Sequence, residues 1–274
     1  MTGLKSSSGP FSLVQLPAER SRSKPRSSGL TMMMDWGLPL GMQEDWLDLV
    51  APFADLAKFV SGTARLYEED YLLQKIALYK KHDVHPFIGG QFLEYIYATQ
   101  GLSSAKPYFE EAKRLGFEAI EVSDNCVPLD RKARQTLIRT AVDCGLEVHG
   151  EVGSKSEDTG AATLIAQANE CFDAGADVVL VEGAELLTDG EPNRRLLAEL
   201  RDGLDVSRVI FELIGPWIPG TRNCDVYDLK KFLISEFGSN VNLANVMPHD
   251  VFETEALRAG LSVVGPSAMM AAAE

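Results

Sequence analysis

The run Ala119-Ile120-Glu121 ends a short apolar segment with a glutamate, and the same pattern returns at Gly150-Glu151, Val181-Glu182 and Phe211-Glu212. The four glutamates are separated by 30, 31 and 30 residues, and a further 30 residues reach Asn242. One strand, one helix and their loops take about 30 residues. Each glutamate is therefore predicted to end one strand of a repeating βα unit, at an equivalent height.

Short apolar runs alternate with amphipathic stretches along most of the chain, which is the pattern of a parallel sheet with helical crossovers. Eight runs are predicted strands: Leu30–Asp35, Leu56–Val60, Val84–Ile88, Ala119–Asp124, Glu147–Val152, Val178–Glu182, Arg208–Leu213 and Val241–Val246. Helices are predicted between them, among others at Tyr71–Lys81, Arg131–Cys144, Ala161–Ala174 and Arg194–Arg201. Glycine directly follows several of these helical stretches, as is typical of helix C-termini.

Eight βα units without a break in composition indicate a single (β/α)8 barrel of the TIM type. The alternative is an open, doubly wound sheet, since the number of strands alone does not close a barrel. No glycine-rich dinucleotide motif follows the first predicted strand, which disfavours this alternative. The predicted domains are a flexible basic arm at residues 1–25, the barrel at residues 26–262 and a small-residue tail at residues 263–274.

The composition of the 274 residues, 45% hydrophobic and 24% charged, is that of a globular protein. It excludes disordered and fibrous classes, and no window is apolar enough for a membrane-spanning helix. The four cysteines form no CxxC pair, so neither a disulfide framework nor a structural zinc site is indicated. We expect a cytoplasmic protein.

The net charge of −14 is unevenly distributed, because residues 1–28 carry +4 and residues 29–274 carry −18. A body this acidic argues against nucleic acid or an anionic membrane as a partner. Any site for an anionic substrate must therefore be formed by local groups.

The four glutamates would converge at the carboxyl-terminal mouth of a barrel, where the chemistry of this fold takes place. Their mutual repulsion calls for a cation among them. Oxygen ligands without a Cys or His cluster indicate Mg²⁺ or Mn²⁺ rather than zinc. The alternative is that some of these glutamates pair with basic residues from the loops.

Basic and glycine residues are predicted near the same mouth. Lys58 lies inside an apolar run, so it is either an ion-pair partner of the glutamates or a substrate-binding group. Lys155 follows the fifth strand and is either a general acid, a phosphate contact or an exposed side chain. Gly89 and Gly90 either bring backbone N–H groups to an anion or form a plain turn. His149 is expected in the core of the barrel.

Several motifs resemble the phosphosulfolactate synthase family, in the same order along residues 24–260. They are Lys24-Pro25-Arg26, Lys58-Phe59, Gly89-Gly90, Gly116-Phe117-Glu118-Ala119-Ile120-Glu121-Val122-Ser123-Asp124, Glu151-Val152-Gly153, Val181-Glu182-Gly183, Val209-Ile210-Phe211-Glu212 and Asn240-Val241-Asn242. The resemblance implies a (β/α)8 barrel in which Mg²⁺ assists the addition of sulfite to phosphoenolpyruvate, a step toward coenzyme M.

The resemblance also implies roles for individual residues. Lys155 matches a lysine of the family and is the candidate acid that protonates carbon. The metal-ligand candidates are Glu121, Glu151 and Glu182, with Glu212 next. The substrate-binding candidates are Arg26, Lys58, Gly89, Gly90, Ser123 and Asn242. The expected partners are small anions, phosphoenolpyruvate and sulfite, and the chain is expected to form a homo-oligomer.

The sequence departs from the family at three places. Ser27-Ser28 replaces a Lys-Thr pair, Ala184 replaces an arginine, and the loop Gly215–Gly220 is longer. The loss of two cations weakens the case for phosphoenolpyruvate and sulfite more than the case for the fold or the metal. Two alternatives follow: a lyase that acts on a different enol acid, and a non-catalytic relative with a binding or stress-protective role, as in the plant heat-stress-associated branch.

Overall fold

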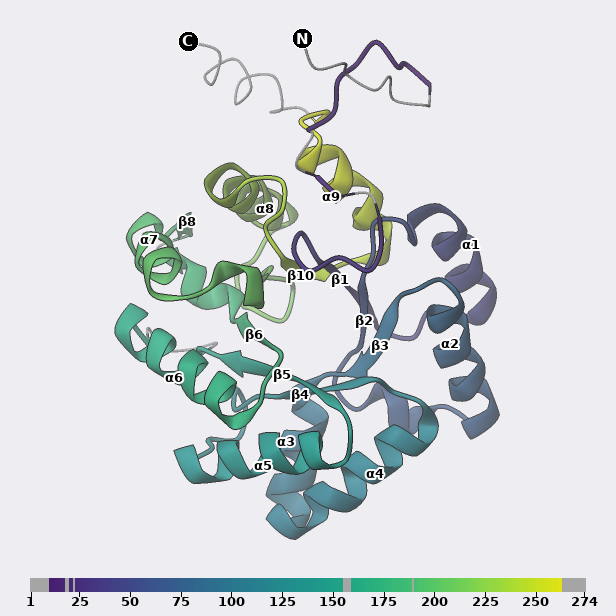
Figure 1. The fold of residues 1–274 in the computed structure, drawn as a ribbon, viewed down its shortest axis with the longest axis vertical. Coiled ribbons are helices and arrows are strands. Elements are labelled where there is room, and N and C mark those ends of the chain that lie inside the picture. Colours follow the sequence, from purple (N-terminus) through teal and green to yellow (C-terminus); the bar gives the residue numbers. More distant parts are fainter. Residues whose placement is uncertain (1–9, 18–19, 22, 155–158, 189, 263–274) are drawn as a thin grey trace.

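Eight parallel strands form the closed barrel of the computed structural model, which describes residues 10–262 except 18, 19, 22, 155–158 and 189. The strands are β1 (Thr31–Asp35), β2 (Leu56–Phe59), β3 (His85–Ile88), β4 (Ala119–Val122), β5 (Glu147–Val152), β6 (Val178–Val181), β9 (Val209–Glu212) and β10 (Leu243–Val246). Their order around the barrel is β1-β10-β9-β6-β5-β4-β3-β2, so β10 closes on β1 (Figure 1). The predicted (β/α)8 barrel is confirmed, and the open sheet is excluded.

Helices surround the barrel and connect successive strands (Figure 1). They are α1 (Leu40–Val50), α2 (Glu69–Lys81), α3 (Gly90–Gln100), α4 (Ala105–Leu115), α5 (Arg131–Asp143), α6 (Ala161–Ala174), α7 (Arg194–Gly203), α8 (Asn223–Phe237) and α9 (Val251–Arg258). Helices α4 and α6 end at Gly116 and Gly175, whose backbones have φ of 95° and 113°. Glycine enters this left-handed region without the steric cost of a side chain.

Two details of the connections differ from the simple βα pattern. Both α3 and α4 lie between β3 and β4, and a short hairpin of β7 (Leu187–Thr188) and β8 (Glu191–Pro192) precedes α7. Neither feature changes the order of strands in the barrel. Within the described residues, we find no helix with the length and apolarity needed to cross a membrane.

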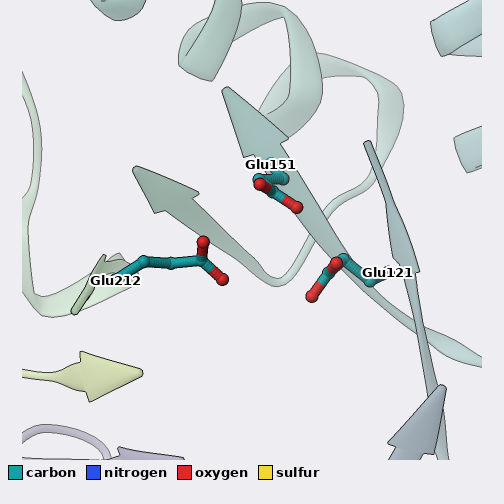
Figure 2. A group of neighbouring side chains, drawn as sticks. All are labelled: Glu121, Glu151 and Glu212. Atoms are coloured by element: carbon teal, nitrogen blue, oxygen red, sulfur yellow. The ribbon is translucent and has the colours of Figure 1, made fainter. Parts of the chain in front are cut away.

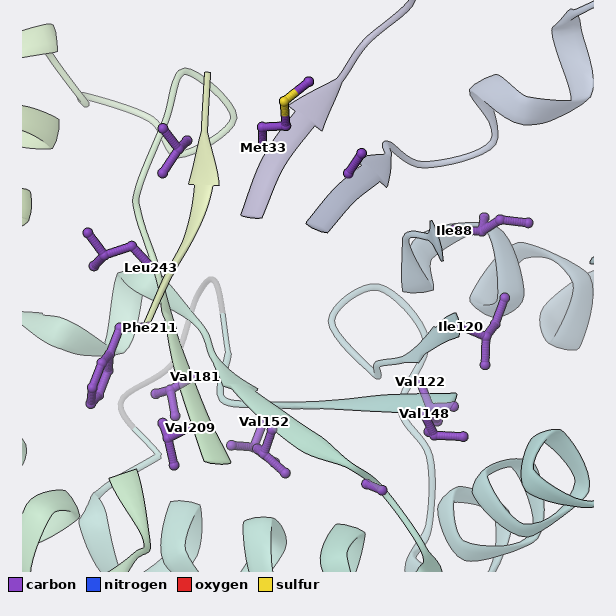
Figure 3. Packing of buried hydrophobic residues seen from close by; sticks show 14 of the residues in the cluster. Met33, Ile88, Ile120, Val122, Val148, Val152, Val181, Val209, Phe211 and Leu243 are labelled. Carbon is purple, nitrogen blue, oxygen red and sulfur yellow. The ribbon is translucent and has the colours of Figure 1, made fainter. Parts of the chain in front are cut away.

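The hydrophobic residues form two layers, as expected for strands whose side chains alternate between faces. The larger cluster fills the space between the outer face of the strands and the helices, and includes Val122, Val152 and Phe211 (Figure 3). The smaller cluster fills the barrel interior with Met32, Leu56, Phe87, Ala119, Leu180, Ile210 and Ala244. A side chain two residues beyond one of these interior positions also points inward, one layer nearer the carboxyl end.

The amino-terminal end of the barrel is covered by residues that precede β1. Arg20 pairs with Glu255 at 2.8 Å, and the Lys24 ammonium donates to the carbonyl of Ala54 at 2.7 Å. Residues 20 and 24 therefore lie against the barrel, although the sequence places them in the arm. The boundary of a flexible arm at residue 25 stays a prediction.

Candidate functional site

Three buried glutamates meet at the carboxyl-terminal end of the barrel. Glu121, Glu151 and Glu212 each place one carboxylate oxygen within 4.8 Å of the others, and each residue is at most 3% exposed. They lie two residues after Ala119, His149 and Ile210, so the alternation of the strands turns them inward. Figure 2 shows the three side chains pointing toward one another from β4, β5 and β9.

Lys58 brings a positive charge to this cluster from β2. Its ammonium lies 2.7 Å from Glu121 Oε2 and 3.1 Å from Glu212 Oε1. Burial alone would lower the pKa of Lys58, but the attraction of Glu121, Glu212 and Glu151 outweighs it and raises this pKa well above its ordinary value. Lys58 is therefore charged. In the structure it is an ion-pair partner of the glutamates, which is one of the two roles predicted for it from the sequence.

The cluster contains three carboxylates beside the ammonium of Lys58. Burial, together with the charge of Glu151, raises the pKa of Glu121 to about 7 against the opposing effect of Lys58. Burial likewise raises the pKa of Glu212 well above its ordinary value. These shifts mean that the folded chain disfavours three ionised carboxylates at this point. A hard divalent cation would remove that cost, and three carboxylate oxygens are a donor set that can hold one.

Gly90 begins α3 directly beside the cluster. Its backbone N–H donates to Glu121 Oε1 at 2.7 Å, so the anion that this glycine approaches is a carboxylate of the protein itself. A Cβ atom at Gly90 would lie 2.2 Å from Ser123 Oγ, so any side chain there would push β4 and α3 apart. Gly89, the N-cap residue of the same helix, lies against the Lys58 side chain.

A second set of hydrogen bonds fixes the loop after β4, and it centres on a buried carboxylate that sequence reasoning did not select. Glu94 of α3 accepts hydrogen bonds from the Ser123 hydroxyl and from the backbone N–H groups of Asn125 (3.2 Å), Cys126 (2.6 Å) and Val127 (2.8 Å). The Asn125 side-chain amide in turn donates to Glu151 Oε1. Ser123 thus serves loop structure, while Asn125 orients a glutamate of the cluster.

Glu182 follows β6, between Glu151 and Glu212 around the barrel, and is 1% exposed. It lies outside the group of three and accepts a hydrogen bond from the N–H of Ala184 at 3.2 Å. Nearby, Glu185 accepts from the N–H groups of Ser154 (2.7 Å) and Thr159 (3.0 Å), on both sides of residues 155–158. Lys155 itself lies outside the described residues.

Two predicted site residues lie at the opposite end of the barrel. Arg26 forms an ion pair of 3.0 Å with Asp55, directly before β2. Asn242 precedes β10 and bonds the backbone of Leu30 and Val209. The strand register pairs Ala244, not Asn242, with Glu212, because β10 begins later in the chain than the 30-residue repeat implies. Arg26 and Asn242 are therefore not brought to the glutamate cluster.

A cavity of about 60 Å³ opens above the cluster. Besides the three glutamates and Lys58, its lining includes Gly89, Gly90, Asn245 and two aromatic side chains, Trp36 and Trp217. His149 lies one layer deeper, with its ring 4.5 Å from that of Phe87. Burial lowers the pKa of His149 to about 3, so this histidine is a neutral core residue, as expected from the sequence.

Several known proteins with a related sequence are phosphosulfolactate synthases. The family model described as (2R)-phospho-3-sulfolactate synthase (ComA) matches residues 19–263. Phosphosulfolactate synthase of Methanocaldococcus jannaschii is 33% identical over 85% of this chain and 92% of its own length. Phosphosulfolactate synthase of Bacillus subtilis is 30% identical over 92% of this chain and 96% of its own length. The Arabidopsis thaliana protein HEAT-STRESS-ASSOCIATED 32 is 23% identical, with 86% and 87% covered.

Solved structures share the barrel at much lower identity. A 3-hexulose-6-phosphate synthase aligns with a TM-score of 0.51 and 17% identity, over 83% of this chain and 98% of its own. A phosphonopyruvate hydrolase aligns with a TM-score of 0.52 and 15% identity, over 84% and 79%. These two similarities concern the fold alone. The sequence matches carry the assignment: this chain belongs to the phosphosulfolactate synthase family, a family of lyase-type enzymes.

Proposed function

We propose that this chain catalyses the Mg²⁺-dependent addition of sulfite to phosphoenolpyruvate. The observation that carries the proposal is the group of three buried glutamates, Glu121, Glu151 and Glu212, at the mouth of the barrel. A protein with only a binding or protective role has little reason to keep three carboxylates buried together, since this arrangement costs stability. Family membership supports the same reaction class.

The reaction forms one carbon–sulfur bond and moves one proton. The sulfur lone pair of sulfite attacks the terminal CH2 carbon of the enol, and the electrons of the double bond move toward the carboxylate. The neighbouring carbon then takes up a proton, and the phosphate ester stays intact. When bound, Mg²⁺ would stabilise the negative charge that develops on the substrate carboxylate. Its ligands would be Glu121, Glu151 and Glu212, with Glu182 at the edge of the group.

Residues of the chain have distinct tasks in this proposal. Lys58 lines the cavity and carries a full positive charge, which suits it to hold an anionic group of the substrate. Asn125 and the N–H of Gly90 orient Glu151 and Glu121. Lys155 is proposed as the acid that protonates carbon, with the ends of its loop held by Glu185.

Phosphorus NMR tests the proposal directly, with purified protein, phosphoenolpyruvate, sulfite and Mg²⁺. We expect a new phosphate-ester resonance that no longer forms when EDTA is added. The control is Glu151→Gln, which keeps the size of the side chain and should give no product. A folded, metal-binding protein that yields no new resonance would contradict the proposed reaction.

A further inference from the structure

Two tryptophans stand over the glutamate cluster. Trp36 follows β1 and is 48% exposed, and Trp217 belongs to the loop after β9. Their ring centroids are 6.3 Å apart, and both rings line the cavity that contains Glu121, Glu151 and Glu212. A reaction between phosphoenolpyruvate and sulfite involves strongly polar reactants, so it does not by itself explain this aromatic surface.

The fold holds both tryptophans in place. Asp35 Oδ1 accepts the N–H groups of Gly37 and Leu38 at 2.8 Å each, while its Oδ2 contacts the buried Lys75 ammonium at 2.8 Å. These contacts fix the loop that carries Trp36. On the other side, the Trp217 ring folds back onto Gly215, where a Cβ atom would come within 2.3 Å of the ring. Glycine at position 215 is thus required for the observed placement of Trp217.

A second, apolar cavity lies behind Trp36. Its volume is about 450 Å³, and it shares Met34 and Trp36 with the cavity above the glutamates. Its other lining residues are Gly37, Leu38, Pro39, Met42, Trp46, Met247, Pro248 and His249. None of these described residues is Asp, Glu, Lys or Arg. A pocket of this kind next to a few convergent polar groups is the usual form of a small-molecule site.

We propose that the substrate class of this enzyme extends from phosphoenolpyruvate to homologues that carry an apolar substituent at C3, and that Trp36 and the cavity behind it bind this substituent. The inference rests on the proposed function, because the acid group of the same substrate must lie at the glutamate cluster. The occupant is a part of the substrate, since the two cavities meet at Met34 and Trp36. Burial of an apolar group against Trp36, Met42 and Met247 would strengthen binding in proportion to the area covered.

Two metal-chelating acids separate the contributions of the two cavities. Oxamate resembles pyruvate, and N-phenyloxamate carries a ring where a C3 substituent would lie. Calorimetric titration of the full chain in Mg²⁺ should give a Kd for N-phenyloxamate at least about tenfold lower than that for oxamate, from the apolar area buried. Equal Kd values would overturn the apolar site and leave the proposed function standing. No binding of either acid would contradict the proposed function itself.

A negative charge introduced into the apolar cavity tests whether this cavity binds the substituent, and the same charge outside the cavity is the control. Met42 and Leu49 are both half-exposed residues of α1, at 50% and 49%, but only Met42 lines the cavity. We expect Met42→Glu to reduce the preference for N-phenyloxamate to less than about threefold and to leave oxamate binding unchanged. Leu49→Glu should retain the full preference. Trp36→Ala should lose the preference as well, and full preference in both Met42→Glu and Trp36→Ala would overturn the proposal.

Discussion

The two ends of the barrel bury charged side chains in opposite ways. At the amino-terminal end, Arg26 pairs with Asp55, and Arg258 donates to the carbonyls of Ser239 (2.7 Å) and Val241 (2.6 Å). At the carboxyl-terminal end, Glu121 and Glu212 share the ion pairs of Lys58 beside Glu151, and the pKa values of Glu121 and Glu212 are raised. The charged groups named at the first end have complementary partners, while the cluster at the second end contains three carboxylates beside the ammonium of Lys58.

This difference separates stability from function within one fold. Polar groups that find complementary partners hold strands and loops together, as is usual at the amino-terminal face of such barrels. A surplus of buried carboxyl groups over cations lowers stability, so its presence indicates a ligand that compensates it.

Glu151→Gln should abolish turnover at the carboxyl-terminal end. We expect the rate of product formation to fall by about a thousandfold or more, since the variant loses one of three carboxylate ligands. The measurement is the phosphorus NMR assay, with circular dichroism to verify the fold. A rate within tenfold of that of the unchanged protein would show that Glu151 is not part of the site.

Asp55→Ala should have the opposite profile, with a large loss of stability and little loss of metal binding. It leaves Arg26 buried without its carboxylate and also removes the acceptor of the Thr31 N–H (2.9 Å). Breaking a buried pair costs about 3 kcal/mol, which urea unfolding can measure. If this variant loses metal affinity while its free energy of unfolding is unchanged, then the amino-terminal end does not serve stability alone.

Glu94→Gln should weaken metal binding, whereas the same change in an exposed carboxylate should not. The amide has one acceptor oxygen in place of two, so the loop that carries Asn125 loses part of its anchor and Glu151 loses its orientation. Changes in such supporting residues raise the Kd of a metal by about tenfold to a hundredfold. The control is Glu111→Gln in an exposed ion pair, for which titration calorimetry should show no change.

Metal binding should strengthen as the pH rises through 7. The pKa of Glu121 is raised to about 7, so below this pH a proton competes with the metal for the carboxylate, and above it the competition ends. The proton of Glu121 alone predicts a Kd for Mg²⁺ about tenfold lower at pH 8 than at pH 6, and competition at Glu212 would add to this difference. A Kd that does not change over this range would contradict the protonated state assigned to Glu121.

Glu212→Gln should stabilise the metal-free protein by about 1 kcal/mol. The folded pKa of Glu212 is raised, so folding takes up a proton, and stability falls as the pH rises above the ordinary carboxyl value of 4.5. The amide is neutral at every pH, and its oxygen can still accept from Lys58. Thermal unfolding should show a gain that is larger at pH 8 than at pH 6, whereas a loss at pH 8 would contradict the account.

The barrel and the positions of its glutamates could be predicted closely from the sequence, because the 30-residue βα repeat determines both. The alternation of a strand places Glu121 and Glu212 two residues beyond interior positions, and the 30-residue repeat brings them to the same end of the barrel. The period fails at Asn242, because loop lengths differ and β10 begins later. The 30-residue repeat does not predict the roles of Glu94 and Asn125, because these roles depend on how α3 and the loop after β4 meet in space.

We expect the glutamates of the carboxyl-terminal end to hold one divalent cation. Electron paramagnetic resonance of added Mn²⁺ tests it most directly, because bound and free Mn²⁺ give different signals. We expect one bound Mn²⁺ per chain, displaced by excess Mg²⁺, retained in Asp55→Ala and lost in Glu151→Gln. Absence of bound Mn²⁺ in the unchanged protein, or equal binding by Glu151→Gln, would contradict the claim.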